Sequence, residues 1–323
     1  MTSVFKSAFA EQLRSFIEFK VSLGFSESTY IDKARSLDSY CFAQCSAIAE
    51  LTEDIVTSWV CFNSDDGTAK LDKVRFARTF GNYLRGLGKN AYVIPSEFTP
   101  KQTKTQIPYL FSKTELTNFF REVDRIEIPN FEFSATMLSV YFRLVYTCGL
   151  RPGEARKLKV NNINIDTGEI SIVHTKNSID RIVVMSEAMR ELCETYLRIR
   201  NVIFNDNDYF FPNTCGSYPS DAWFQKYFKK AFARSYPDTP EQQLPFVRVY
   251  NLRHQFASDV IHKWINDGED LENKLPYLQA FMGHTDISQT AYYIHLLPDK
   301  LKNNAGIYWS NMNSLIPEVE SNE

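Results

Sequence analysis

Hydrophobic residues recur at helical spacing through the first 90 residues of the chain. Phe9, Leu13 and Phe16 begin one such series, which predicts a helix over about 8–23. Similar series predict helices over about 26–42, 52–62 and 71–87, with Gly, Ser, Asn and Asp between them. Four helices in so short a segment indicate a small helical domain over residues 1–92.

The helical periodicity stops at residues 93–108. This segment contains three prolines, which is typical of a linker. Beyond it, Ser112 is followed three residues later by Glu115, the pattern of a helix N-cap, so a second domain is predicted over 109–297. Its helices are expected at about 113–124, 131–148, 152–159, 187–203, 221–235, 250–264, 271–282 and 286–296.

Three short apolar runs lie in the middle of the second domain, at 163–165, 170–172 and 181–185. Asp166-Thr167-Gly168 reads as a hairpin turn between the first two, and the segment that contains Lys176 connects the second to the third. The fold predicted is therefore mainly α with a small antiparallel β-meander.

Composition narrows the class of protein. The hydrophobic fraction of 44% and the charged fraction of 23% are typical of a globular protein. No apolar run approaches the roughly 18 residues that span a bilayer, and the N-terminus lacks the apolar core of a secretory signal. Six cysteines without a CxxC pair and five scattered histidines suggest a cytoplasmic protein without a zinc site.

Basic residues gather between positions 70 and 89, although the net charge is −3. Taken alone, a solvated charged face is the commoner reading of such a run, and a phosphate-binding face is the alternative. A local basic stripe is sufficient for DNA binding whatever the total charge. The candidate DNA-binding residues, including two in the linker, are Lys70, Lys73, Arg75, Arg78, Arg85, Lys89, Lys101 and Lys104.

Arg151 precedes Pro152, and proline prefers the first position of a helix, so Arg151 falls at the N-cap. That position usually belongs to Ser, Thr, Asp or Asn. An anion bound at the helix start would explain the arginine, and pairing with Glu154 would explain it equally well.

Three further residues are each ambiguous alone. Arg253 lies in an otherwise apolar helix series, where an internal salt bridge is the common explanation and a phosphate contact the alternative. His284 follows Gly283 before a predicted helix and could be a structural turn residue. Tyr293 is one of 17 tyrosines, most of which are expected to be core or surface aromatics.

Together these residues resemble the motifs of the tyrosine recombinase, or phage integrase, family of site-specific DNA recombinases. The matching pieces, in chain order, are residues 149–154 (GLRPGE), Lys176, residues 252–254 (LRH), residues 283–284 (GH) and Tyr293. The step of nine residues from His284 is specific and selects Tyr293 over Tyr292. The N-terminal helices look like the family's core-binding domain.

The resemblance implies a mechanism. Tyr293 would attack the scissile phosphate, giving a 3′-phosphotyrosyl link and a free 5′-hydroxyl. Arg151 and Arg253 would stabilise the charge on phosphorus, and His284 would donate a further hydrogen bond. Lys176 would protonate the leaving oxygen as general acid. No cofactor or metal is implied.

Supporting roles fall to Glu154 and His254. One position departs from the family pattern, because the family usually has histidine or lysine three residues before the second arginine, and this chain has Tyr250. The proton acceptor for Tyr293 is therefore open.

The resemblance also implies partners. These are double-stranded DNA carrying recombination sites, further copies of the chain (dimer to tetramer on DNA) and accessory recombination proteins. The apolar tail 298–323 would dock on a neighbouring protomer. We expect a cytoplasmic, nucleoid-associated enzyme of a mobile element, whose task the sequence leaves open among integration, excision, transposition, inversion and dimer resolution. A type IB topoisomerase and a non-catalytic DNA-binding protein with the same fold are the alternatives.

Overall fold

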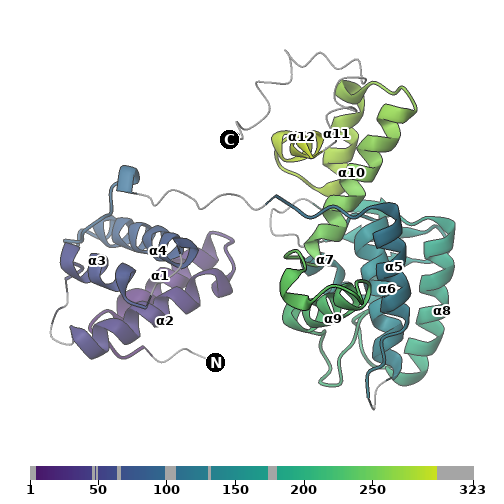
Figure 1. Ribbon diagram of the computed structural model, residues 1–323. Coiled ribbons are helices and arrows are strands. Elements are labelled where there is room, and N and C mark those ends of the chain that lie inside the picture. The colour runs from purple at the N-terminus through teal and green to yellow at the C-terminus, as the bar shows by residue number, and fades with distance from the viewer. Residues whose placement is uncertain are drawn as a thin grey trace. The chain divides into compact units, whose positions relative to one another are not determined.

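The computed structural model describes residues 5–45, 48, 50–63, 67–98, 107–129, 132–173 and 180–296. It is mainly helical with one small sheet, which confirms the predicted fold class. The chain divides into two compact units, residues 1–107 and residues 108–323 (Figure 1).

The first unit is a group of helices around an aromatic core. Phe16 packs edge-on against Phe80 with ring centroids 5.3 Å apart, and Trp59 packs against Phe76 at 5.9 Å. All four side chains are buried, as the helical spacing predicts. The helices are α1 (Ala10–Ser22), α2 (Glu27–Gln44), α3 (Glu53–Cys61) and α4 (Gly67–Gly86), followed by the short η1 (Ser96–Phe98).

Lys73 in α4 does not lie on a DNA-facing surface, which corrects its assignment from the sequence. Its side chain is 9% exposed, and its ammonium donates to the carbonyls of Trp59 (3.0 Å) and Phe62. These carbonyls lie at the C-terminal end of α3, where a cation is favourable. Lys73 therefore holds α3 against α4.

Two arginines of α4 also bind main-chain carbonyls of the segment that follows the helix. Arg78 donates to Ile94 (2.8 Å) and Pro95 (2.7 Å), and Arg85 donates to Ala91 (2.7 Å). Part of the basic run thus fixes the chain that leaves α4. Arg75 and Lys89 are exposed and Lys70 is half-buried, whereas Lys101 and Lys104 lie outside the described residues.

The second unit contains the sheet. Strands β1, β2 and β3 are antiparallel in that order, with Ile163 opposite Ile170 and Ser171 opposite Ile182. The elements are α5 (Lys113–Asp124), α6 (Glu132–Thr147), α7 (Pro152–Ala155), η2 (Val160–Asn162), β1 (Ile163–Asn164), β2 (Glu169–Ile172), β3 (Arg181–Val184), α8 (Glu187–Ile203), α9 (Asp221–Arg234), η3 (Glu241–Gln243), α10 (Tyr250–Asn266), α11 (Leu271–Met282) and α12 (Ser288–His295).

Helix α7 is shorter than the predicted 152–159. It ends at Ala155 because the following main chain pairs with a distant segment. Val160 N donates to Asp208 O (2.8 Å), and Phe210 N donates to Leu158 O (2.7 Å). These long-range bonds replace helical ones, and local sequence patterns do not reveal them.

Side-chain caps set the starts of α5, α8 and α11 close to their predicted places. Ser112 Oγ accepts from Glu115 N (3.2 Å), and Glu115 in turn accepts from Ser112 N (2.7 Å), so α5 begins in a complete capping box. The Ser186 side chain caps α8 by accepting from Met189 N, and the Asp270 side chain caps α11 by accepting from Glu272 N. Helix α11 ends at Gly283, which has φ +66°.

Aromatic side chains dominate the core of the second unit. Tyr141 of α6 stacks on Phe224 of α9 with ring centroids 3.6 Å apart, and Phe119 of α5 meets Phe228 of α9 at 4.9 Å. Helix α10 packs against α6, α11 and α12, and Figure 1 shows α11 and α12 together at one end of the unit. No helix in the described part of the chain is long and apolar enough to cross a membrane.

Candidate active site

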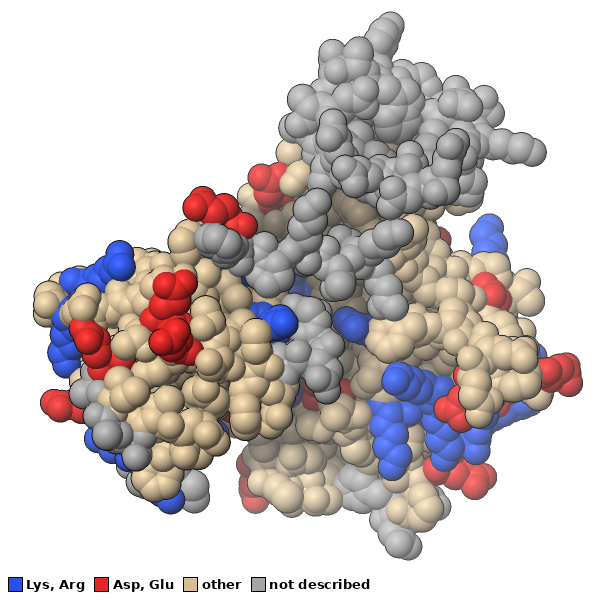
Figure 2. All heavy atoms as spheres, turned by 60° about the vertical axis from the view of Figure 1, so that its left-hand side comes forward, with Lys and Arg blue, Asp and Glu red and all other residues tan. Residues whose placement is uncertain are grey.

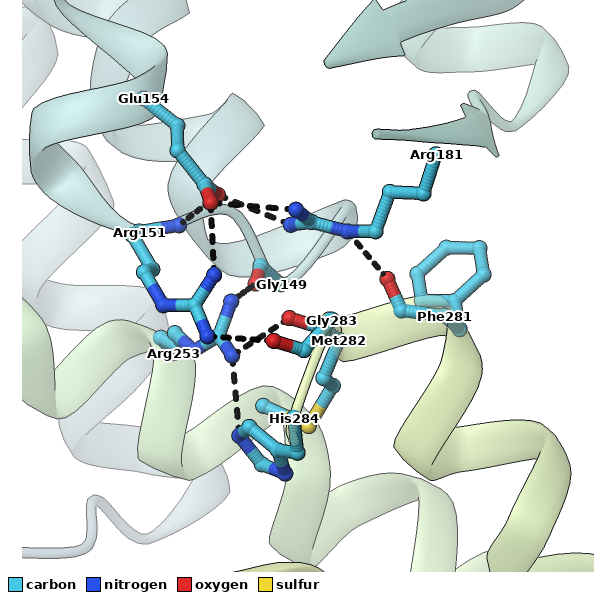
Figure 3. Close-up of polar contacts among 9 residues, drawn as sticks. All are labelled: Gly149, Arg151, Glu154, Arg181, Arg253, Phe281, Met282, Gly283 and His284. Atoms are coloured by element: carbon cyan, nitrogen blue, oxygen red, sulfur yellow. Dashed lines mark hydrogen bonds and ion pairs between the residues drawn. The ribbon is translucent and has the colours of Figure 1, made fainter. Parts of the chain in front are cut away.

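Arg253 lies at the centre of the site and has no exposed surface. Its guanidinium donates to Gly149 O (2.6 Å) and Met282 O (2.8 Å), and it meets His284 Nε2 at 2.9 Å (Figure 3). None of these acceptors is a carboxylate, so the internal salt bridge left open by the sequence is not the reason for this arginine. The positive charge of this buried guanidinium is therefore not offset by a carboxylate in contact with it.

Glu154 joins two further arginines beside this centre. It accepts from Arg151 N (2.9 Å) and Nη1 (2.8 Å), and Arg181 forms a two-pronged ion pair with it at 3.0 and 2.8 Å. Arg151 Nη2 also reaches Gly283 O at 2.5 Å, and Arg181 Nε donates to Phe281 O at 2.8 Å. Together they fix the end of α11 relative to α7 and β3 (Figure 3).

The network keeps Glu154 ionised. Burial acts to raise the pKa of this carboxyl, but the hydrogen bonds and charge of Arg181, together with those of Arg151, lower the pKa to about 2. Both readings of Arg151 are compatible with this arrangement, because it pairs with Glu154 while its side chain remains 21% exposed.

His284 is held in one tautomer. Because the Arg253 guanidinium can only donate, His284 Nε2 must accept from it, and Nδ1–H then donates to Thr290 Oγ1 at 2.8 Å. Burial and the neighbouring arginines, Arg253 first, lower the pKa of His284 to about 3, so the ring is neutral. Thr290 is fully buried and is a site residue that the sequence analysis missed.

Tyr293 lies in the same centre and is 3% exposed. Its Oη is 3.2 Å from His254 Nδ1. Burial raises the pKa of Tyr293, and the charge of Arg253 opposes that shift. The pKa of His254 is lowered to about 4 by burial and by Arg253, so this ring is also neutral near pH 7.

A cavity of about 520 Å³ opens beside the centre. Tyr250 lines it at the start of α10, together with Arg151, Glu154, Lys157 and Arg248. The structure thus brings together six residues named from the sequence and places Tyr250 at the edge of the site, whereas Lys176 lies outside the described residues. The six are Arg151, Glu154, Arg253, His254, His284 and Tyr293.

No group of three or more His, Cys, Asp or Glu side chains suited to a metal ion occurs among the residues that the structure describes. The chemistry that the described groups offer is cationic and hydrogen-bonding. Arginines and imidazoles surround a phenol, an arrangement suited to a phosphate group.

Gly283 is required by the network around it. Its φ is +66°, and an added Cβ would lie 2.9 Å from Arg181 Nη1. We expect Gly283→Ala to lower the free energy of unfolding by about 1–2 kcal/mol from backbone strain alone. Displacement of Arg181 should add to this loss, as measured by urea unfolding. Gly268→Ala is the matched control, because Gly268 has φ +73° after α10 with open space around it. Equal losses in both variants would contradict the expectation.

Comparison with known proteins identifies the family. The model of the phage integrase family matches residues 115–300, more than half of the chain. A candidate integrase/recombinase of Sinorhizobium fredii, y4rB, is 24% identical over 309 residues, covering 92% of this chain and 95% of that protein. The tyrosine recombinase XerD of Listeria innocua is 25% identical over 78% of this chain and 80% of its own length.

Solved structures share the fold. The XerH recombinase in a pre-cleavage complex with its difH substrate superposes with a TM-score of 0.64 at 19% identity, covering 94% of this chain and 85% of that one. The Tn1549 transposon integrase bound to transposon-end DNA gives 0.61 at 13% identity, with 94% and 99% covered. The chain therefore belongs to the phage integrase family: it is a tyrosine recombinase, an enzyme that binds, cleaves and rejoins DNA at specific sites.

Proposed function

We propose that Tyr293 is the nucleophile of this recombinase. Its Oη would attack the scissile phosphorus, forming the tyrosyl O–P bond while the bond to the 5′-oxygen breaks. The products are a 3′-phosphotyrosyl link and a free 5′-hydroxyl, and attack by a 5′-hydroxyl from another duplex reverses the step. The observation that carries this proposal is the convergence of Arg253, His254 and His284 around the Tyr293 ring.

Arg151 and Arg253 are proposed to bind the non-bridging phosphate oxygens. Both guanidiniums can donate in pairs, which suits phosphate, and Arg151 lines the cavity through which DNA would approach. A bound phosphate also favours the protonated form of His284, in which both ring nitrogens donate. Lys176 is proposed to give its proton to the leaving 5′-oxygen.

DNA binding must expose the centre. Arg253 is 0% exposed and Tyr293 is 3% exposed in the protein without DNA, so a phosphate cannot reach either group as they stand. We propose that contact with DNA shifts the short helix α12, which carries Tyr293. The enzyme would then cleave only DNA that it has bound correctly.

The remaining surface suits local rather than general DNA contact. Figure 2 shows Lys and Arg in separate groups between acidic and uncharged surface, consistent with a net charge of −3. We propose that residues 1–92 form a core-binding domain that contacts DNA through residues such as Arg75 and Lys89, with the linker 93–108 supplying Lys101 and Lys104. The catalytic domain would extend over 109–297.

Assembly and biological role are part of the same proposal. Lambda integrase, which shares the fold, is seen as a dimer bound to a core site, and we propose a dimer or tetramer of this chain on DNA. The tail 298–323, outside the described residues, would dock on a neighbouring protomer. The structural likeness to a transposon integrase supports the proposal that this recombinase belongs to a mobile element. It would act on nucleoid DNA in the cytoplasm.

A covalent-trapping experiment tests the nucleophile. The recognised sequence is first selected from random duplexes by binding, and a nicked, labelled duplex of it is then incubated with the protein. We expect a protein–DNA adduct on a denaturing gel with the unaltered chain and with Tyr292→Phe, and none with Tyr293→Phe. If the adduct were lost only in Tyr292→Phe, the nucleophile would be Tyr292 and the assignment of Tyr293 would be wrong. Specific binding without any adduct would favour a non-catalytic protein.

A further inference from the structure

The phenol of Tyr293 needs a proton acceptor that the family pattern does not supply here. The position three residues before Arg253, where the family usually has histidine or lysine, is Tyr250 in this chain. We propose that His254 accepts the proton of Tyr293 when the DNA strand is cleaved. This inference rests on the proposed role of Tyr293 as nucleophile.

The geometry places one imidazole nitrogen against the reacting oxygen. His254 Nδ1 is 3.2 Å from Tyr293 Oη, within reach of direct proton transfer. His254 lies four residues after Tyr250 in α10, so the two share a face of the helix. The Tyr250 ring packs edge-on against the imidazole with centroids 4.9 Å apart. The base is therefore displaced by one helical turn from its usual position.

The direction of the hydrogen bond follows from the neighbours of Tyr293. Arg253 acts on the phenol oxygen by its charge, and a guanidinium cannot accept a hydrogen bond, so the phenol hydrogen cannot go to Arg253. We assign that hydrogen to His254 Nδ1, which lies 3.2 Å from the phenol oxygen. That nitrogen then offers a lone pair, and the ring hydrogen is on Nε2.

His284 cannot serve as the acceptor in this arrangement. Its Nε2 lone pair already receives a hydrogen bond from Arg253, and its Nδ1–H is given to Thr290. His254 is thus the imidazole whose lone pair faces Tyr293, among the site residues that the structure describes.

The charges around His254 make its ability to accept the proton of Tyr293 depend on bound DNA. The groups that face His254 are Tyr250 and Arg253 from α10, Tyr293 from α12 and His284 from the α11–α12 connection. Burial and the positive charge of Arg253 hold the pKa of His254 to about 4, so it is unprotonated and able to accept. A phosphate bound at Arg253 offsets that positive charge and raises the pKa of His254, which makes proton transfer from Tyr293 less costly.

The proton balance closes in both directions. During cleavage the proton passes from Tyr293 Oη to His254 Nδ1 as the O–P bond forms, and the leaving 5′-oxygen takes a proton from Lys176. During rejoining the 5′-hydroxyl attacks, and the His254 imidazolium returns its proton to the departing Tyr293 oxygen. The same residue therefore serves as base in one direction and as acid in the other.

The test compares variants on two substrates in single turnover. His254→Asn places an amide oxygen near the Nδ1 position, so it accepts a hydrogen bond but is not basic. We expect it to cleave about 10²–10⁴-fold more slowly than the unaltered protein. A substrate with sulfur in place of the bridging 5′-oxygen, whose thiolate leaves without a proton, should not restore that rate. The same substrate should restore cleavage by Lys176→Ala.

Two outcomes would overturn the inference. Cleavage by His254→Asn at close to the unaltered rate would show that the histidine only positions Tyr293. Rescue of His254→Asn by sulfur would place its action at the leaving group. Tyr293→Phe, run in parallel, keeps these outcomes separate from a failure of the proposed function, which would appear as an adduct that survives this substitution.

A second measurement does not depend on the folding of a variant. The cleavage rate of the unaltered protein should rise with pH through one ionisation and reach a plateau, because the acceptor must be unprotonated at the start of the reaction. A rate that is independent of pH from 4 to 8 would overturn the inference. Where His254→Asn folds, as judged by its binding to the selected duplex, this rise should be absent.

Discussion

Replacement of Arg253 by lysine is expected to slow DNA cleavage by about 10²–10³-fold, the usual cost of removing one donor that stabilises a transition state. The guanidinium reaches Gly149 O, Met282 O and His284 Nε2 at the same time, in different directions. A lysine has one compact ammonium on a flexible stem and cannot reproduce this fork. It would leave at least one buried acceptor unpaired and would hold the phosphate less well.

The measurement is the single-turnover rate on the nicked duplex, corrected for the folded fraction. Arg198→Lys is the matched control, because Arg198 is 73% exposed and pairs with Glu194 on the surface of α8. Its stability should change by no more than about 0.5 kcal/mol and its cleavage not at all. If Arg253→Lys cleaves as fast as the control, the placement of Arg253 at the phosphate is wrong.

Replacement of Arg181 by methionine is expected to lower the free energy of unfolding by about 3–5 kcal/mol, because it removes one of the two arginines that neutralise a buried carboxylate. The Arg181 side chain is 6% exposed and that of Glu154 is 10% exposed. Glu154 would keep only Arg151, and Phe281 O would lose its donor. Cleavage should also slow, since Glu154 sets the position of Arg151.

The loss of unfolding free energy in Arg181→Met should depend on pH, and the ionisation of Glu154 determines the direction of that dependence. The folded protein holds the pKa of this carboxyl at about 2, below its ordinary value of 4.5. The stabilisation is therefore complete above pH 4.5 and is lost as the pH falls toward 2. Urea unfolding should show the difference between Arg181→Met and the unaltered chain shrinking over that range.

An exposed pair provides the control for this prediction. Arg198 is 73% exposed and its partner Glu194 is 48% exposed. Arg198→Met should cost about 0–1 kcal/mol at any pH in the range, because solvent screens exposed pairs. An Arg181→Met variant as stable as this control would mean that the pair with Glu154 contributes little.

The predicted fold follows the structure most closely where local chemistry decides it. Helices α5, α8 and α11 begin at Ser112, Ser186 and Asp270, whose side chains cap the first turn, and the sequence shows these residues directly. Helix α7 was predicted too long because its end depends on main-chain pairing with Asp208 and Phe210, some 50 residues away in the chain.

In the site too, residues in local motifs could be predicted from the sequence, and residues placed by long-range contacts could not. Motif spacing predicts Arg151, Arg253, His284 and Tyr293 as site residues, and the structure brings them together. Arg181 was missed because its two partners lie 27 and 100 residues away and follow no period. Lys73 was misassigned for a related reason, since a basic residue at helical spacing looks the same whether it faces solvent or the carbonyls of another helix.

The net positive charge of the centre has a further consequence for the reaction. Arg151 and Arg181 share the carboxylate of Glu154, the contacts of Arg253 among the described residues are to neutral acceptors, and both histidines are neutral before DNA binds. Two positive charges thus remain without a counter-ion. A phosphodiester brings one negative charge, and a five-coordinate phosphorane carries two. The excess positive charge therefore stabilises the phosphorane more than the phosphodiester, so binding is stronger at the moment of strand transfer than before it.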